Sequence, residues 1–140
     1  MEEFASQFNA DTEASKREKN ITDHIVDAAF SVHRTMGPGL LESIYQDCLA
    51  KEFLMRNIPF ATQVNVPLIY KGQPLNKHFI LDMLVADEVV VEIKAVAELQ
   101  PIHEAQLLSY LKLTNKKIGY LLNFKVPLMK NGIRRMRNGY

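Results

Sequence analysis

HFILDMLVADEVVVEIKAV, residues 78–96, is the stretch that decides the fold of this chain. It contains two apolar runs rich in β-branched residues, joined by the polar segment Ala86-Asp87-Glu88, which is the pattern of a β-hairpin. Three charged residues, Asp82, Glu92 and Lys94, interrupt runs that otherwise resemble core strands. Because burying a charge without a partner is costly, the presence of these residues in core-like strands needs a reason.

The register of this hairpin decides whether the charged residues meet. Side chains alternate between faces along a strand, so Glu92 and Lys94 share one face. A three-residue loop would pair Val85 with Val89. Asp82 would then lie directly opposite Glu92, with Cβ atoms roughly 4.5–5.5 Å apart, whereas a two-residue turn would send Glu92 to the other face. Opposed carboxylates repel one another, and a hard divalent cation between them would replace this repulsion with coordination.

The composition is that of one globular domain with an apolar core. The 140 residues are 47% hydrophobic and 24% charged. No apolar run approaches the ~20 residues that span a bilayer, and the acidic start lacks the features of a secretory signal. We therefore expect a soluble cytoplasmic protein with no membrane partner. Residues 1–18 are polar and without sustained periodicity, which predicts a flexible extension before a single domain over residues 19–140.

Charge is distributed unevenly along the chain. Residues 1–104 contain all 16 acidic residues and 9 of the Lys and Arg residues, a net charge of −7, whereas residues 105–140 contain 8 basic residues and no acidic one. The basic segment could bind a polyanion such as nucleic acid, or form a solvated surface that faces acidic neighbours. Its terminal basic residues are Lys125, Lys130, Arg134, Arg135 and Arg137.

The remaining elements are predicted from the spacing of apolar residues. Spacings of three and four predict a helix from Ile21 to the Gly37-Pro38-Gly39 turn and two more over about 40–56 and 102–113. Alternation predicts a strand over 63–70, where Pro67 favours an edge position, and an apolar run predicts a buried strand over 117–124. Residues 125–140 are interpreted as a basic tail. The order α-α-β-β-β-α-β predicts a mixed central sheet flanked by helices.

Three further residues are candidates for the site. Glu42 lies in the first turn of the second predicted helix, where the helix dipole alone explains an acidic residue. Gln106 and Tyr110 are four residues apart and share a face of the third. With the charged residues of the hairpin, Glu42 and Gln106 could form an oxygen-rich pocket for Mg²⁺ or Mn²⁺. Such a pocket suits phosphodiester hydrolysis, in which the metal activates water and Lys94 orients that water or stabilises developing charge.

The run Gly39-Leu-Leu-Glu42-Ser-Ile-Tyr45 resembles the signature of the GxxExxY family, a bacterial family of small proteins assigned to the PD-(D/E)XK nuclease superfamily. The resemblance covers roughly residues 21–124. It continues in order through VHRxxGPG (32–39), Gln63-Val, the Tyr70-Lys-Gly turn, Leu81-Asp82, Val91-Glu-Ile-Lys94, Glu104-Ala-Gln106-x-x-x-Tyr110-Leu and Gly119-Tyr-Leu-Leu-Asn123-Phe124.

The resemblance implies a restriction-endonuclease-like fold and a role for each candidate residue. Asp82 and Glu92 would be metal ligands, Lys94 the catalytic lysine and Glu42 an upstream acidic residue at the metal. Gln106 and Tyr110 resemble the QxxxY element of the RecB-like branch, in which this helix borders the active site and DNA. Leu81 stands where the superfamily nominally has proline.

The leading hypothesis is a divalent-metal-dependent nuclease that acts on DNA rather than RNA. Tyr110 and the terminal basic residues would hold the substrate. One alternative is a catalytically inactive module on the same fold that binds nucleic acid or another protein. A small-molecule phosphoesterase ranks lowest, because the chain has no Gly-rich phosphate loop. A twofold homodimer is expected because it is the commonest soluble oligomer.

Overall fold

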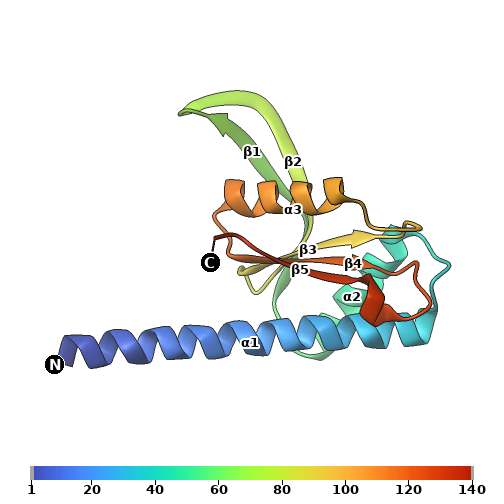
Figure 1. Cartoon of the computed structure of the whole chain (residues 1–140), viewed down its shortest axis with the longest axis horizontal. Coiled ribbons are helices and arrows are strands. Elements are labelled where there is room, and N and C mark those ends of the chain that lie inside the picture. Colours follow the sequence, from blue (N-terminus) through green and yellow to red (C-terminus); the bar gives the residue numbers. More distant parts are fainter. Residues whose placement is uncertain (1, 140) are drawn as a thin grey trace.

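The chain folds into a five-stranded mixed sheet flanked by helices (Figure 1). A computed structural model describes the backbone of residues 2–139 and the side chains of residues 12–139. The fold class is the one predicted, and the predicted order is confirmed through the fourth strand. The elements are α1 (Glu2–Met36), α2 (Glu42–Met55), β1 (Phe60–Tyr70), β2 (Gln73–Val85), β3 (Val89–Lys94), α3 (Pro101–Thr114), β4 (Ile118–Asn123), the 3-10 helix η1 (Met129–Gly132) and β5 (Ile133–Arg137).

The strands lie side by side in their sequence order, β1-β2-β3-β4-β5. Strands β3 and β4 are parallel because α3 returns the chain across the sheet between them, and the other pairs are antiparallel. The position of Pro67 on the edge strand β1 confirms that prediction. Helices α1 and α2 pack on one face of the sheet and α3 on the other, so the sheet has an apolar cluster on each face.

The β2–β3 hairpin has the register that brings the charged residues together. Val85 pairs with Val89, and the pairing continues outward to Met83 and Val91. Residues 86–88 therefore form the loop, in which the Glu88 N–H donates to the Val85 carbonyl over 3.0 Å. One step further outward places Asp82 opposite Glu92. Of the two turns that the sequence left open, the structure has the three-residue loop, which the family motifs require if Asp82 and Glu92 are to meet.

The first helix is much longer than its apolar stripe. Helix α1 begins at Glu2, whereas the sequence predicted a flexible extension over residues 1–18 and a helix from Ile21. Its early turns contain good helix formers and the ion pair of Lys16 with Glu13, which stabilise a helix without an apolar face. Arg17 Nε then contacts Glu88 Oε1 in the β2–β3 loop at 2.5 Å. Met1 lies outside the described residues.

The segment interpreted as a basic tail is instead part of the sheet. Residues 133–137 form β5, which pairs antiparallel with β4 over Ile118–Leu122. The prediction of a tail was wrong because it weighed the basic residues and overlooked the apolar residues Met129, Ile133 and Met136 among them. Met129 and Ile133 pack in the cluster beneath α1, and Met136 packs in the cluster beneath α3. Tyr140 lies outside the described residues.

Gly132 occupies a position that no side chain fits. A Cβ atom there would lie 2.0 Å from the Asn123 carbonyl oxygen, because η1 crosses directly over the end of β4. We expect Gly132→Ala to lower the free energy of unfolding by about 1–3 kcal/mol, measured by urea denaturation. Gly39→Ala is the matched control, since no atom lies within 4 Å of its added Cβ. Equal denaturation midpoints for the two variants would contradict this packing.

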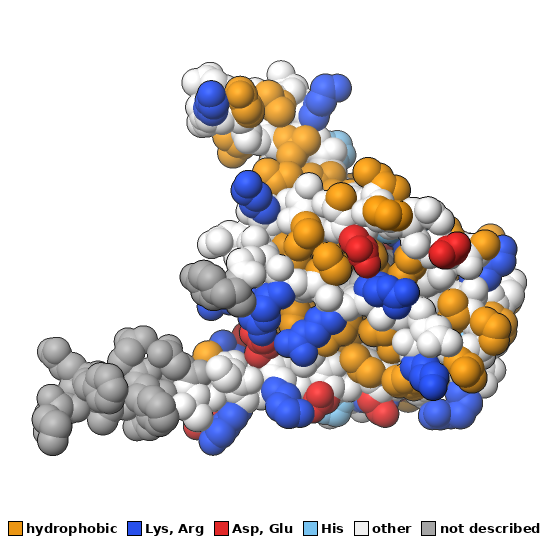
Figure 2. Space-filling model, in the orientation of Figure 1, with side chains coloured by type: hydrophobic (Ala, Val, Ile, Leu, Met, Phe, Trp, Pro, Cys, Tyr) orange, Lys and Arg blue, Asp and Glu red, His pale blue; other side chains and the backbone are white. Residues whose placement is uncertain are grey.

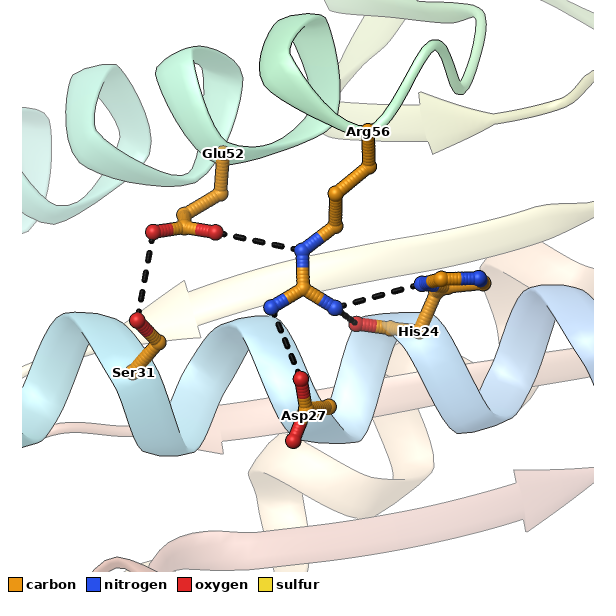
Figure 3. Close-up of polar contacts among 5 residues, drawn as sticks. All are labelled: His24, Asp27, Ser31, Glu52 and Arg56. Atoms are coloured by element: carbon orange, nitrogen blue, oxygen red, sulfur yellow. Dashed lines mark hydrogen bonds and ion pairs between the residues drawn. The ribbon is translucent and has the colours of Figure 1, made fainter.

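A partly buried arginine fixes α2 on α1 (Figure 3). Arg56, at the end of α2, donates from Nε to Glu52 over 3.1 Å and from Nη2 to Asp27 of α1 over 2.8 Å. Glu52 also accepts a hydrogen bond from the Ser31 hydroxyl of α1 over 3.2 Å. Because these bonds tie the two helices together, they set the position of Glu42 at the other end of α2.

Among the helices that the structure describes, none has the length and apolar character of a membrane-spanning segment.

Candidate active site

The carboxylates of Asp82 and Glu92 each accept a backbone hydrogen bond from the opposite strand of the hairpin. The Asp82 N–H donates to Glu92 Oε2 over 3.0 Å, and the Ile93 N–H donates to Asp82 Oδ2 over 2.9 Å. These carboxylates take the place of backbone acceptors just beyond the last paired residues, Met83 and Val91. One oxygen of each carboxylate is thereby fixed to the backbone. The two side chains also hydrogen-bond to one another.

Glu92 is held in an environment that disfavours its charge. Its side chain is 4% exposed. Burial and the adjacent charge of Asp82 raise its pKa to about 9, and the nearby positive charge of Lys94 opposes this rise. Glu92 is therefore protonated at neutral pH in the metal-free protein. A cation that binds there must displace this proton.

Glu42 reaches the end of β3 from the start of α2. Its Oε1 accepts a hydrogen bond from the Ala95 N–H over 3.2 Å, directly after Lys94. Glu42 and Asp82 line one pocket of about 410 Å³, whose other lining residues are Ser43, Gln46, Gln63 and Ile93. The structure thus brings Glu42 to the pocket of Asp82. The helix dipole alone does not account for this position.

Lys94 is the last residue of β3 and is half-buried. It lies two residues after Glu92 and so shares its face of the strand. The positive charge of Lys94 lowers the pKa of Glu92, so the Lys94 ammonium group lies close enough to act on the Glu92 carboxyl. The chain beyond Lys94 is held by Asn123, whose buried amide accepts from the Val96 N–H and donates to the Val96 carbonyl, both over 3.0 Å.

Helix α3 covers the site from the other side. The Tyr110 ring stacks on Phe79 of β2, with centroids 4.3 Å apart and planes 3° from parallel. Burial and the negative charges of Glu92 and Asp82 raise the pKa of the Tyr110 hydroxyl, and a hydrogen bond with the Gln106 side chain opposes this rise. The structure therefore brings Gln106 and Tyr110 to the carboxylates, on the face predicted for them.

The terminal basic residues do not gather at one place. Lys125 lines a pocket with Glu42 and Ala95, and Lys130 is exposed on η1. The three arginines of β5 have acidic neighbours: Arg134 lies 3.9 Å from Glu104, and Arg135 and Arg137 both contact Glu18. For these arginines the structure shows the second sequence alternative, a basic surface that faces acidic residues.

Two residues of the site were missed as functional candidates. Gln63 lies opposite Asp82, in a gap of the β1–β2 pairing, with a positive φ of 50°. Its side chain donates to the Gln46 side chain over 2.9 Å at the wall of the pocket. Gln63 was noted in the sequence only as part of the family resemblance, because an amide within an alternating strand is too common to identify a site by itself. Asn123 gave the same weak signal at the end of β4.

The oxygen donors of the site suit a hard divalent cation. Among the side chains that the structure describes, no three His, Cys, Asp or Glu residues gather closely enough to hold a metal ion. Asp82 and Glu92 form an adjacent pair, while Glu42 lies across the pocket, bonded to the Ala95 N–H. This arrangement fits Mg²⁺, which proteins commonly hold with one or two carboxylates while waters and substrate phosphate complete its coordination.

Residues 19–136 match the PD-(D/E)XK nuclease superfamily, over most of the chain. Nucleases of this superfamily act on nucleic acids and generally use divalent metal ions. No curated protein shows significant sequence similarity to the chain.

Proposed function

Because the chain belongs to the PD-(D/E)XK nuclease superfamily, we propose that it is a divalent-metal-dependent nuclease that hydrolyses phosphodiester bonds in DNA. The observation that carries this proposal is the pair of backbone hydrogen bonds that hold the Asp82 and Glu92 carboxylates next to one another in the β2–β3 hairpin. Two carboxylates held together inside a strand pair destabilise the metal-free protein, and a catalytic cation accounts for their retention. Lys94 on the same face adds the positive charge that phosphate chemistry needs.

Each candidate residue has a role in this proposal. Asp82 and Glu92 would hold Mg²⁺ or Mn²⁺, with Glu42 at the opposite wall of the pocket. When bound, the metal ion lowers the pKa of water and neutralises charge on the phosphate. Lys94 orients the attacking water and stabilises developing negative charge. The α3 residues Gln106 and Tyr110 position the substrate. Of the terminal basic residues, Lys125, which lines a pocket with Glu42, and the exposed Lys130 would hold phosphates, whereas Arg134, Arg135 and Arg137 face acidic residues.

The GxxExxY motif has a physical explanation that supports placing the chain in that family. The Tyr45 hydroxyl donates to the Gly37 carbonyl over 2.5 Å and accepts from the Leu40 N–H over 3.0 Å. Its ring is buried and stacks on Phe124, with centroids 4.3 Å apart. Tyr45 thereby fixes the turn that precedes α2. Glu42, the acidic residue of the motif, begins the helix that this turn introduces.

We expect purified protein to cleave DNA in Mg²⁺ or Mn²⁺ and to be inactive in EDTA. The assay compares double-stranded DNA, single-stranded DNA and RNA, because the superfamily alone does not fix the substrate. Asp82→Asn should lower the cleavage rate at least tenfold. Asp47→Asn, the same change at an exposed position of α2, is the control and should cleave normally. Binding of nucleic acid with no metal-dependent cleavage would instead identify an inactive binding module.

A further inference from the structure

Strands β1 and β2 extend beyond the sheet as a two-stranded arm (Figure 1). We define the hairpin arm as residues 66–79. At its base, Val66 pairs with Phe79, and both pack in the cluster beneath α3. Strand β3 pairs with β2 only over Met83–Val85, so within the described residues the arm has no strand partner beyond its own two strands. Four further residues of β1 follow Val66, which corresponds to a projection of about 13 Å.

The arm exposes apolar side chains that a free hairpin does not need. Ile69 is 60% exposed, Tyr70 61% and Leu75 45%. An isolated two-stranded hairpin is marginally stable in water, and apolar side chains that stay this exposed bury little area to stabilise it. At the tip, Lys71 Nζ lies 5.4 Å from the centroid of the Tyr70 ring, so charge and aromatic surface are presented together. These features indicate a surface that binds something.

The charge of the arm indicates what it binds. Residues 57–81 contain no Asp or Glu, although residues 1–104 as a whole carry a net charge of −7. The arm itself contributes Lys71, Lys77 and His78, all exposed. In the view of Figure 2, the projecting arm shows basic and apolar side chains and no acidic ones. A surface with this composition is complementary to a polyanion.

The arm begins at the wall of the candidate active site. Gln63 of β1 lines the pocket with Glu42 and Asp82. Asn65 and Pro67 follow Gln63 at alternate positions of β1 and are exposed. One face of β1 therefore runs continuously from the pocket to the arm. A ligand held along the arm would therefore pass the carboxylates.

We propose that the hairpin arm enters the major groove of duplex DNA and places the sugar-phosphate backbone of one DNA strand at Asp82 and Glu92. This inference rests on the proposed nuclease function. A two-stranded β-ribbon fits the B-DNA major groove, which is roughly 12 Å wide and 8.5 Å deep, so a projection of about 13 Å reaches its floor. Lys71 and Lys77 would contact phosphates, and Tyr70 would contact apolar base edges. The major groove of duplex RNA is too narrow for a ribbon, so the arm selects DNA.

The test measures binding without cleavage, by fluorescence anisotropy in EDTA. The probes are a 20-base-pair DNA duplex, in roughly the size range of DNA-binding sites, and an RNA duplex of the same sequence. The paired variant Lys71→Ala/Lys77→Ala should bind the DNA duplex at least tenfold more weakly and lower the slope of log K against log salt by about 2. Lys16→Ala/Lys51→Ala removes the same charge from exposed positions of α1 and α2 and should change the affinity less than twofold. Circular dichroism confirms that both variants fold.

Three results would overturn the inference. They are unchanged DNA affinity in the arm variant, RNA duplex bound as tightly as DNA duplex, and no DNA binding by the wild-type protein. Sedimentation tests the competing occupant, a second copy of this chain: a wild-type dimer that Tyr70→Ala converts to monomer would also overturn it. A different result would overturn the nuclease proposal. Arm-dependent binding without any cleavage in Mg²⁺ or Mn²⁺ would remove the nuclease function and leave the DNA-binding arm.

Discussion

Lys94→Ala should lower the rate of metal-dependent DNA cleavage by about 10²- to 10³-fold, the usual effect of removing one group that stabilises transition-state charge. Lys94 ends β3 two residues after Glu92, and its positive charge already acts on the Glu92 carboxyl. In the cleavage reaction the same charge would stabilise the phosphate as it becomes more negative. Single-turnover rates with saturating protein measure this loss without interference from product release.

The matched control for Lys94→Ala is Lys51→Ala. Lys51 is exposed on α2, so it undergoes the same chemical change away from the carboxylates. The melting temperature of both variants separates a catalytic role from a structural one, because a structural lysine would lower stability and rate together. Cleavage by Lys94→Ala at the rate of the control would contradict the role assigned to Lys94.

Glu92→Gln should change how stability depends on pH. The unfolded chain releases the Glu92 proton near the ordinary value of 4.5, whereas the folded protein holds it to about 9. Between these values unfolding releases a proton, so the free energy of unfolding of the metal-free wild type falls as pH rises, by up to about 1.4 kcal/mol per pH unit. Glutamine has no proton to lose and does not contribute this slope.

We therefore expect the free energy of unfolding of Glu92→Gln, relative to that of the wild type, to rise by about 2–4 kcal/mol from pH 5 to pH 8 in EDTA. The glutamine side-chain oxygen can still accept the Asp82 N–H, which keeps the packing of the strand pair. Urea denaturation at several pH values measures the difference. Glu98→Gln, at an exposed position after β3, is the control and should follow the wild type. Parallel curves for wild type and Glu92→Gln would show that the Glu92 carboxyl is not held protonated.

The sequence predicted the centre of the molecule better than its ends. Two β-branched runs around Ala86-Asp87-Glu88 indicate the hairpin, but they do not select its register by themselves, because the valines of β3 are buried on both faces of the sheet. Helix α1 before Ile21 has good helix formers and ion pairs but no apolar stripe, so periodicity could not detect it. In β5, the apolar Ile133 and Met136 stand among arginines, and their packing depends on contacts far along the chain.

The candidate site was predicted only in part, because some of its contacts depend on how distant parts of the chain pack together. The residues alone left two registers open for the hairpin, and the motifs of the family resemblance favoured the one in which Asp82 meets Glu92. The approach of Gln63 and the reach of Glu42 to Ala95 depend on how β1 and α2 pack against β3. For Glu42 the resemblance to a family supplied what local chemistry could not.

Binding of Mn²⁺ to the purified protein, followed by calorimetry, tests most directly that Asp82 and Glu92 form a metal site. We expect the wild-type protein and Asp47→Asn to bind Mn²⁺ with equal affinity, and Asp82→Asn to bind at least tenfold more weakly, because it removes one of two adjacent carboxylate ligands. Equal Mn²⁺ affinity in all three proteins, or no binding by the wild type, would contradict the account.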